Sequence, residues 1–144
     1  MHNDDYETCE KTYASLCIYP GDMDPKVVTK RLGIEPTSFH RSGEPLPCSK
    51  NNLLAKINGW FLCSENIIES KDSQRHVDWI LDQLYAQRDA VLELQKAGCK
   101  MDVACFWASK HGHGGPTISP EQMRRLADLN LDLWFDFYNN TCNE

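Results

Sequence analysis

Segments of alternating apolar and polar residues are separated by segments of helical periodicity along the whole chain, and this order constrains the fold most. The segments 13–19, 60–64, 101–108 and 131–138 are rich in β-branched and aromatic residues and predict strands. Helix-start signals lie between them, at Asp24-Pro25, at Asp72 or Ser73, and at Ser119-Pro120. The first helix is expected to end at Gly33, and the second to run to about Ala97, before Gly98.

The resulting β-α-β-α-β-α-β order predicts an α+β domain with a single antiparallel or mixed sheet and packed helices. A ferredoxin-like topology is the preferred arrangement. The residues 24–33 also echo the residues 119–128, because each has a cap, a proline, apolar positions, a basic pair and a leucine at equal offsets. This echo indicates a duplicated strand–helix unit.

Charge is unevenly distributed along the 144 residues, whose formal net charge is −6. Residues 1–11 hold Asp4, Asp5, Glu7 and Glu10 and are predicted to be an acidic flexible tail. We expect residues 12–140 to form a single domain and 141–144 to be a second tail. The chain shows no basic stripe of the kind that binds a phosphate backbone, so nucleic acid is not an expected partner.

Several function classes lack their sequence signals. No apolar run approaches the roughly 20 residues of a membrane span, and the N-terminus has no signal-peptide pattern. The seven cysteines are odd in number and include no Cys-x-x-Cys pair, which favours reduced thiols in the cytoplasm over disulfides or zinc. We therefore predict no membrane contact and a cytoplasmic location.

The glycine-rich loop 110–117, which contains His111, His113, Gly114 and Gly115, is the most unusual stretch. Glycines let a backbone approach a ligand, and the helix that follows offers its N-terminus to anions. The competing interpretation is a plain strand-to-helix turn, which we favour. Two histidines fall short of a zinc ligand set, so no metal site and no cofactor are predicted.

Two further polar positions invite a functional interpretation. Arg41 can bind a carboxylate or a phosphate with its planar fork, although a solvated loop is the simpler interpretation. His76 falls in the first turn of a helix, where a neutral, packed imidazole is favoured over a cation. No nucleophile elbow and no complete catalytic set is present, so no catalytic residue is predicted.

The last predicted strand separates two kinds of side chain by its alternation. We expect Leu131, Leu133, Phe135 and Phe137 to enter the core. The other face of the strand carries Asp132, Trp134, Asp136 and Tyr138. Exposed aromatic residues anchor protein interfaces, and carboxylates among them suit a basic partner. Alternatively, the irregular segment 34–58 or a helix covers this face, which makes the aromatic residues a second core.

A family resemblance emerges from motifs spread over residues 13–138. They are Tyr13-Ala14-Ser15-Leu16, Asp24-Pro25, Thr29-x-Arg31-Leu32-Gly33, His40-Arg41-x-Gly43, Gly59-Trp60, His76-x-x-Trp79-Ile80-Leu81, Cys105-Phe106-Trp107, Gly112-His113-Gly114-Gly115-Pro116-Thr117 and Phe135-Asp136-Phe137-Tyr138. In these the chain resembles a bacterial family known as domain of unknown function 4279. The resemblance implies no activity, cofactor or catalytic residue, but it does imply a role like that of toxin-immunity proteins. The candidate binding residues that map onto its motifs are Arg41, Trp60, His76, His113, Gly114 and Gly115.

These observations lead to competing hypotheses about function. The leading one is a non-enzymatic module that binds another protein, a basic one, through Asp132, Trp134, Asp136 and Tyr138, with an immunity-type role as its specific form. The second is a small-molecule or anion-binding protein, or an enzyme, built on the histidine–glycine loop. A third is a homo-oligomer that uses the aromatic face as its subunit interface.

Overall fold

The computed structural model describes residues 2–46 and 49–139 and has one mixed sheet with helices packed on it. The elements in chain order are β1 (Cys9–Tyr19), α1 (Pro25–Leu32), β2 (Ser38–His40), β3 (Gly59–Cys63), α2 (Ser73–Leu84), the 3₁₀ turn η1 (Tyr85–Gln87), α3 (Arg88–Lys96), β4 (Lys100–Ser109), α4 (Pro120–Asp128) and β5 (Asp132–Asn139). The predicted α+β class with a single mixed sheet is confirmed. The predicted tail 141–144 and residue 140 lie outside the described residues.

The five strands of the sheet are ordered β2-β3-β1-β4-β5. The pairs β2–β3, β3–β1 and β1–β4 are antiparallel, whereas β4 and β5 are parallel and are joined through α4. The two edges differ in length, because β2 has three residues and β5 has eight.

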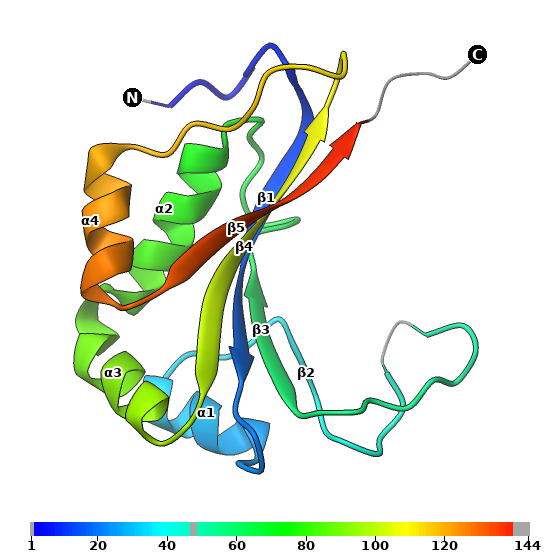
Figure 1. Ribbon diagram of the computed structural model, residues 1–144, viewed down its shortest axis with the longest axis vertical. Coiled ribbons are helices and arrows are strands. Elements are labelled where there is room, and N and C mark those ends of the chain that lie inside the picture. The colour runs from blue at the N-terminus through cyan, green and yellow to red at the C-terminus, as the bar shows by residue number, and fades with distance from the viewer. Residues whose placement is uncertain (1, 47–48, 140–144) are drawn as a thin grey trace.

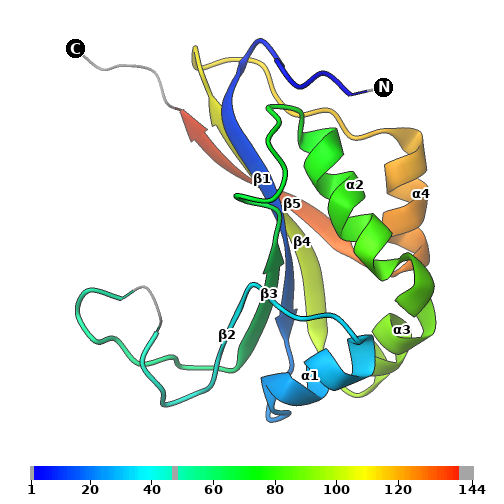
Figure 2. The ribbon, with the colours of Figure 1, turned by 180° about the vertical axis from the view of Figure 1, so that it is seen from behind.

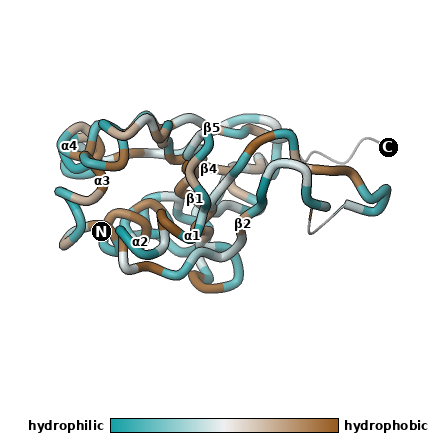
Figure 3. Tube along the Cα trace, turned by 90° about the horizontal axis from the view of Figure 1, so that it is seen from below, coloured by the Kyte–Doolittle hydropathy of each residue, from teal (hydrophilic) through white to brown (hydrophobic). Residues whose placement is uncertain are grey.

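All four α-helices lie on the same side of the sheet, as Figures 1 and 2 show. The apolar stripes of these helices pack against the side chains on one face of the central strands, and this contact forms the core. The core includes Ala14, Leu16, Ile18, Trp60, Leu62, Val103, Val28, Leu32, Ile80, Leu81, Leu84, Val91 and Leu94, each at most 5% exposed. Viewed from below, the segment between β2 and β3 extends to the other side, away from the helices (Figure 3).

Helix capping explains why the chain changes from strand to helix where it does. The Asp24 carboxylate accepts the Lys26 N–H at 2.8 Å, and Pro25 occupies the first turn of α1. Ser119 and Gln122 form a reciprocal capping box at the start of α4. Gly33 ends α1 with a φ of 69°, a left-handed conformation that favours glycine. These predicted boundaries are confirmed.

The predicted order of elements needs two corrections. Strand β2 was missed, because three residues beside a proline-rich segment carry no detectable alternation. The long second helix is divided by η1 into α2 and α3. Its apolar stripe runs through Leu84, but Gln87 and Arg88 stand where a continuous stripe needs apolar residues, so the helix changes direction there.

Strand boundaries also differ from the prediction at the N-terminus. Strand β1 begins at Cys9, four residues before the expected start at Tyr13, and Cys9 and Thr12 are buried. The acidic residues before it contact the domain, as described below. None of the helices in the described part of the chain is long and apolar enough to cross a membrane.

Candidate functional site

The sheet face opposite the helices carries a row of aromatic rings across three adjacent strands. The Tyr13 ring of β1 stacks on the Phe106 ring of β4, with centroids 4.6 Å apart and planes 7° apart. Phe106 in turn contacts Tyr138 of β5, with centroids at 5.0 Å. The strand register produces this row, because it places Tyr13 opposite Phe106 and Ala108 opposite Tyr138. We call this side of the sheet the open face.

A second aromatic group lies on the same face near the other edge. The rings of Tyr19 and Phe61 meet edge to face at 5.9 Å, and His40 lies 5.3 Å from Phe61. His40 also donates its Nδ1–H to the Ile57 carbonyl at 2.9 Å, which fixes the imidazole. The described parts of the segment 41–58, residues 41–46 and 49–58, therefore border this end of the face. They do not cover β5, where Trp134 and Tyr138 are 48% and 51% exposed.

Carboxylates are interspersed with the rings on β4 and β5. Asp102 accepts the Trp134 indole N–H at 2.9 Å, which fixes the exposed ring across the sheet surface. Within residues 2–46 and 49–139, neither Asp132 nor Asp136 has an ion-pair partner. Burial raises the pKa of the Tyr13 hydroxyl, and nearby acidic groups, among them Glu65 and Asp136, raise it further. Lys11 lies over the Tyr13 ring, 5.6 Å from its centroid, so the unpaired carboxylates of this face are those on β5.

The predicted interface residues share this face. Asp132, Trp134, Asp136 and Tyr138 alternate along β5 and pair in register with Asp102, Ala104, Phe106 and Ala108 of β4. Sequence reasoning missed Phe106, Phe61 and His40. The alternation in 101–108 could have indicated Phe106, but His40 needed the unrecognised strand β2.

The prediction that Phe135 and Phe137 enter the core is wrong. They lie on the helix side of β5, but their side chains are 43% and 50% exposed, and only Leu131 and Leu133 join the core. The reason is a difference in length. The nine residues of α4 span about 13 Å at 1.5 Å per residue, whereas the eight residues of β5 span about 26 Å at 3.3 Å per residue.

Arg41 forms a salt bridge within the domain. Its Nε donates to one Asp24 oxygen at 2.9 Å and its Nη2 to the other at 3.1 Å. Hydrogen bonding to this guanidinium lowers the pKa of Asp24, the same carboxylate that caps α1. Arg41 thereby ties the segment after β2 to the start of α1.

Trp60 and His76 are enclosed on the helix side. Trp60 is 0% exposed, and its indole N–H donates to Thr29 Oγ1 at 2.9 Å. His76 donates its Nε2–H to the Ser70 carbonyl at 2.8 Å, and its Nδ1 accepts the Ser64 hydroxyl at 2.6 Å. Burial lowers the pKa of His76, so the neutral imidazole fits this pair of bonds.

A half-open pocket of about 430 Å³ borders His76. Its lining includes Lys11 and Glu65, which pair with each other at 2.5 Å, and the residues 66–69. Both nitrogens of His76 already have protein partners, so the imidazole offers no free atom to a molecule in this pocket.

The glycine-rich loop is held by the N-terminal segment. The Tyr6 hydroxyl donates to the Gly115 carbonyl at 2.7 Å, and Lys110 donates its N–H to the Thr8 carbonyl at 2.9 Å. Gly114 has a φ of 89°, and a Cβ at this position would collide with Thr8. The rings of His111 and His113 are both exposed, with centroids 5.9 Å apart and planes 25° apart. Gly114 is therefore needed for the turn itself.

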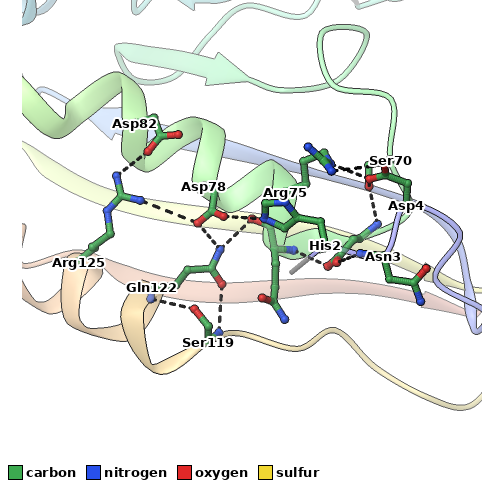
Figure 4. Close-up of polar contacts among 12 residues, drawn as sticks. His2, Asn3, Asp4, Ser70, Arg75, Asp78, Asp82, Ser119, Gln122 and Arg125 are labelled. Carbon is green, nitrogen blue, oxygen red and sulfur yellow. Dashed lines mark hydrogen bonds and ion pairs between the residues drawn. The ribbon is translucent and has the colours of Figure 1, made fainter.

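The acidic N-terminal segment, which was predicted to be a flexible tail, contacts α2 through a chain of polar bonds that Figure 4 shows. Asn3 donates its backbone N–H to Asp72 at 2.6 Å, and Asp4 accepts from Arg75 at 2.6 Å and from Ser70 at 2.7 Å. His2 lies 2.7 Å from Asp78, which also accepts from Gln122 of α4 at 2.8 Å. This network joins the segment to α2 and α4.

Arg41, Trp60, His76 and His113 thus each have a separate set of partners, and no contact between them is seen. No group of three or more His, Cys, Asp or Glu side chains in the described part of the chain could hold a metal ion. The residues that the structure does bring together are those of the open face, which defines an aromatic and acidic sheet surface on an α+β domain.

Comparison with known protein families identifies the family of this domain. The chain belongs to the family described as Domain of unknown function (DUF4279), which matches residues 10–140. No curated protein and no solved structure matches the chain.

Proposed function

We propose that the protein is a binding module whose open face takes a basic region of another protein. The observation that supports this proposal is that Asp132 and Asp136 lie beside exposed aromatic rings and have no cationic partner among residues 2–46 and 49–139. A lysine or arginine of the partner would pair with these carboxylates, while its apolar neighbours cover Trp134 and Tyr138. The existing bond between Trp134 and Asp102 holds one anchor in place before binding.

An immunity-type role is the specific form of this proposal, in which the bound protein is a toxin. Its support is the family resemblance and the acidic residues of β5 on the open face, which suit a toxin that is basic. We also propose a reducing location such as the cytoplasm. Burial raises the pKa of the Cys9 thiol to about 11 and that of Cys17 and Cys105 to about 12, so these cysteines are poor nucleophiles.

The test compares two variants of matched composition by affinity capture from host lysate. One carries Asp132→Asn, Trp134→Ala and Asp136→Asn on the open face. The other carries Asp82→Asn, Tyr85→Ala and Asp89→Asn on the helix side, where Tyr85 is 81% exposed. Both remove two negative charges and one aromatic ring, and circular dichroism checks that both fold.

We expect one stoichiometric protein to bind the wild type and the helix-side variant, and to be lost from the open-face variant. The complex should weaken as salt rises, because charge pairs are screened. A partner that binds all three proteins equally would contradict the proposal. An anion or small-molecule site on the loop 110–117 stays a prediction, to be tested by thermal shift if no protein is captured.

We further propose a ferredoxin-like arrangement for the first four strands. Its support is that β1 and β2 run in the same direction with β3 between them, while β3 and β4 do so with β1 between them. The proposed duplicated unit is supported by the matching Pro-led starts of α1 and α4, which follow β1 and β4. Superposition of β1–α1 on β4–α4 in an experimental structure tests it.

A further inference from the structure

Strand β5 is an edge of the sheet. It holds eight residues, Asp132–Asn139, paired on one side with β4 in an unbroken register, and among residues 2–46 and 49–139 no strand pairs with its other side. Proteins usually protect edges with charged side chains, lysine above all, with proline, with a bulge or by a very short strand. Strand β5 has no proline and no lysine, and its pairing with β4 shows no bulge, so its two charged residues, Asp132 and Asp136 on the open face, are its only protection of these kinds. The opposite edge, β2, is protected by its length of three residues.

Aromatic side chains are exposed on both faces of this edge. Trp134 and Tyr138 on the open face are 48% and 51% exposed, and Phe135 and Phe137 on the helix side are 43% and 50% exposed. An added strand would pack against the flanks of all four rings, because each lies on the strand that it would join, and the open face itself would stay accessible. A partner on the open face alone would leave Phe135 and Phe137 in water.

We propose that a second copy of this chain is that added strand, so that two β5 edges pair antiparallel about a twofold axis perpendicular to the sheet. Directly opposed residues in an antiparallel pair point to the same face. This axis keeps the helices of both copies on the same side of the sheet, so two opposed residues must both lie on the open face or both on the helix side. This holds only in registers in which one residue of β5 pairs with the same residue of the second copy. The helices of both copies then lie on the same side of a continuous sheet.

The positions of the charges select one of these registers. Centring on Asp136 would place this carboxylate opposite itself, and centring on Trp134 would place Asp132 opposite Asp136. Directly opposed like charges destabilise a strand pair. Registers centred on any residue outside 134–136 would pair five or fewer of the eight residues of β5. Centring on Phe135 pairs residues 132–138 and opposes no two charges.

The Phe135 register also matches residue types on each face. On the helix side, Phe135 meets its own copy and Leu133 meets Phe137, which forms a continuous apolar row. On the open face, Trp134 meets Asp136 and Asp132 meets Tyr138. The two open faces join into one surface, and the interface has the self-complementary form that a twofold dimer requires. This inference does not depend on the proposed binding of a basic protein.

The test measures the solution mass of the wild type, of Phe135→Lys and of Phe135→Glu by sedimentation velocity. The wild type should sediment at about twice the chain mass of 16.5 kDa. Each variant alone should be monomeric, because it places like charges at the centre of the interface. An equimolar mixture of the two should restore the dimer, since lysine then opposes glutamate. Met123→Lys is the control, because Met123 on α4 is also exposed and should leave the dimer intact.

Three results would overturn the proposal. A wild type that is monomeric at its highest soluble concentration excludes the dimer, whatever the outcome of the capture experiment. A folded Phe135→Lys variant that stays dimeric assigns the interface to another surface. A mixture of the two charged variants that stays monomeric shows that residue 135 does not meet its own copy.

Discussion

Trp60 and Trp134 lie on opposite faces of one sheet and differ in their exposure to solvent. Each indole N–H donates one hydrogen bond of 2.9 Å, to Thr29 in the first case and to Asp102 in the second. Trp60 is nevertheless 0% exposed under the helices, whereas Trp134 is 48% exposed. The hydrogen bond is thus common to both, and only burial distinguishes a structural ring from one available to a partner.

The largest expected effect is the difference between removing these two rings. Trp60→Ala should lower the free energy of unfolding by about 3–5 kcal/mol, because it leaves a cavity and an unpaired Thr29 hydroxyl. Trp134→Ala should lower it by less than about 1 kcal/mol, because about half of the ring is already in water and the one hydrogen bond lost is exposed. Urea unfolding of both variants measures this, and equal losses would contradict the distinction between the faces.

A smaller effect is expected inside the glycine-rich loop. Gly114→Ala should destabilise the fold by roughly 1–3 kcal/mol, because alanine is strained at positive φ and its Cβ meets Thr8. Gly115→Ala is the matched control and should change stability by less than about 0.5 kcal/mol, since a Cβ there meets nothing within 4 Å. Thermal unfolding compares the two, and a neutral Gly114→Ala would show that this loop is not packed against the N-terminal segment.

The pH dependence of stability tests the enclosure of His76. Its pKa is lowered by burial, so the folded state holds the neutral form while the unfolded chain takes up a proton near pH 6.5. Stability is therefore complete above pH 6.5 and falls as the pH decreases toward the folded pKa. One such group gives a slope of at most about 1.4 kcal/mol per pH unit.

The comparison for this prediction is His76→Gln, which keeps polar atoms but does not titrate in this range. Urea unfolding between pH 7.5 and 5 should show a steeper loss for the wild type than for the variant. Identical slopes would mean that His76 takes up protons equally in both states, contrary to its two fixed hydrogen bonds.

Much of the fold could be predicted because its signals are local. The cap and proline at Asp24-Pro25 and the capping box at Ser119 and Gln122 set helix starts that no distant contact alters. The missed features depend on contacts between distant residues. Strand β2 is defined by pairing with β3 over three residues, and the exposure of Phe137 is decided by how far α4 reaches along β5.

The candidate site divides in the same way. The alternation of β5 correctly separates Asp132, Trp134, Asp136 and Tyr138 from their neighbours, because side-chain direction in a strand is a local property. The polar residues that match the family motifs predicted the candidate site less well than this alternation did. Arg41 meets Asp24 and His76 meets Ser64, and neither pairing has a signal in residue spacing.

The smallest expected effect concerns the stability of the open face itself. Asp132 and Asp136 have no ion-pair partner in residues 2–46 and 49–139, so Asp132→Asn together with Asp136→Asn should change the free energy of unfolding by no more than about 0.5 kcal/mol. Chemical unfolding at low and high salt measures this. A large loss would place these carboxylates among the structural groups, like Asp24 beside Arg41. An unchanged fold with a lost partner would instead separate binding from stability, which is what a face reserved for another protein requires.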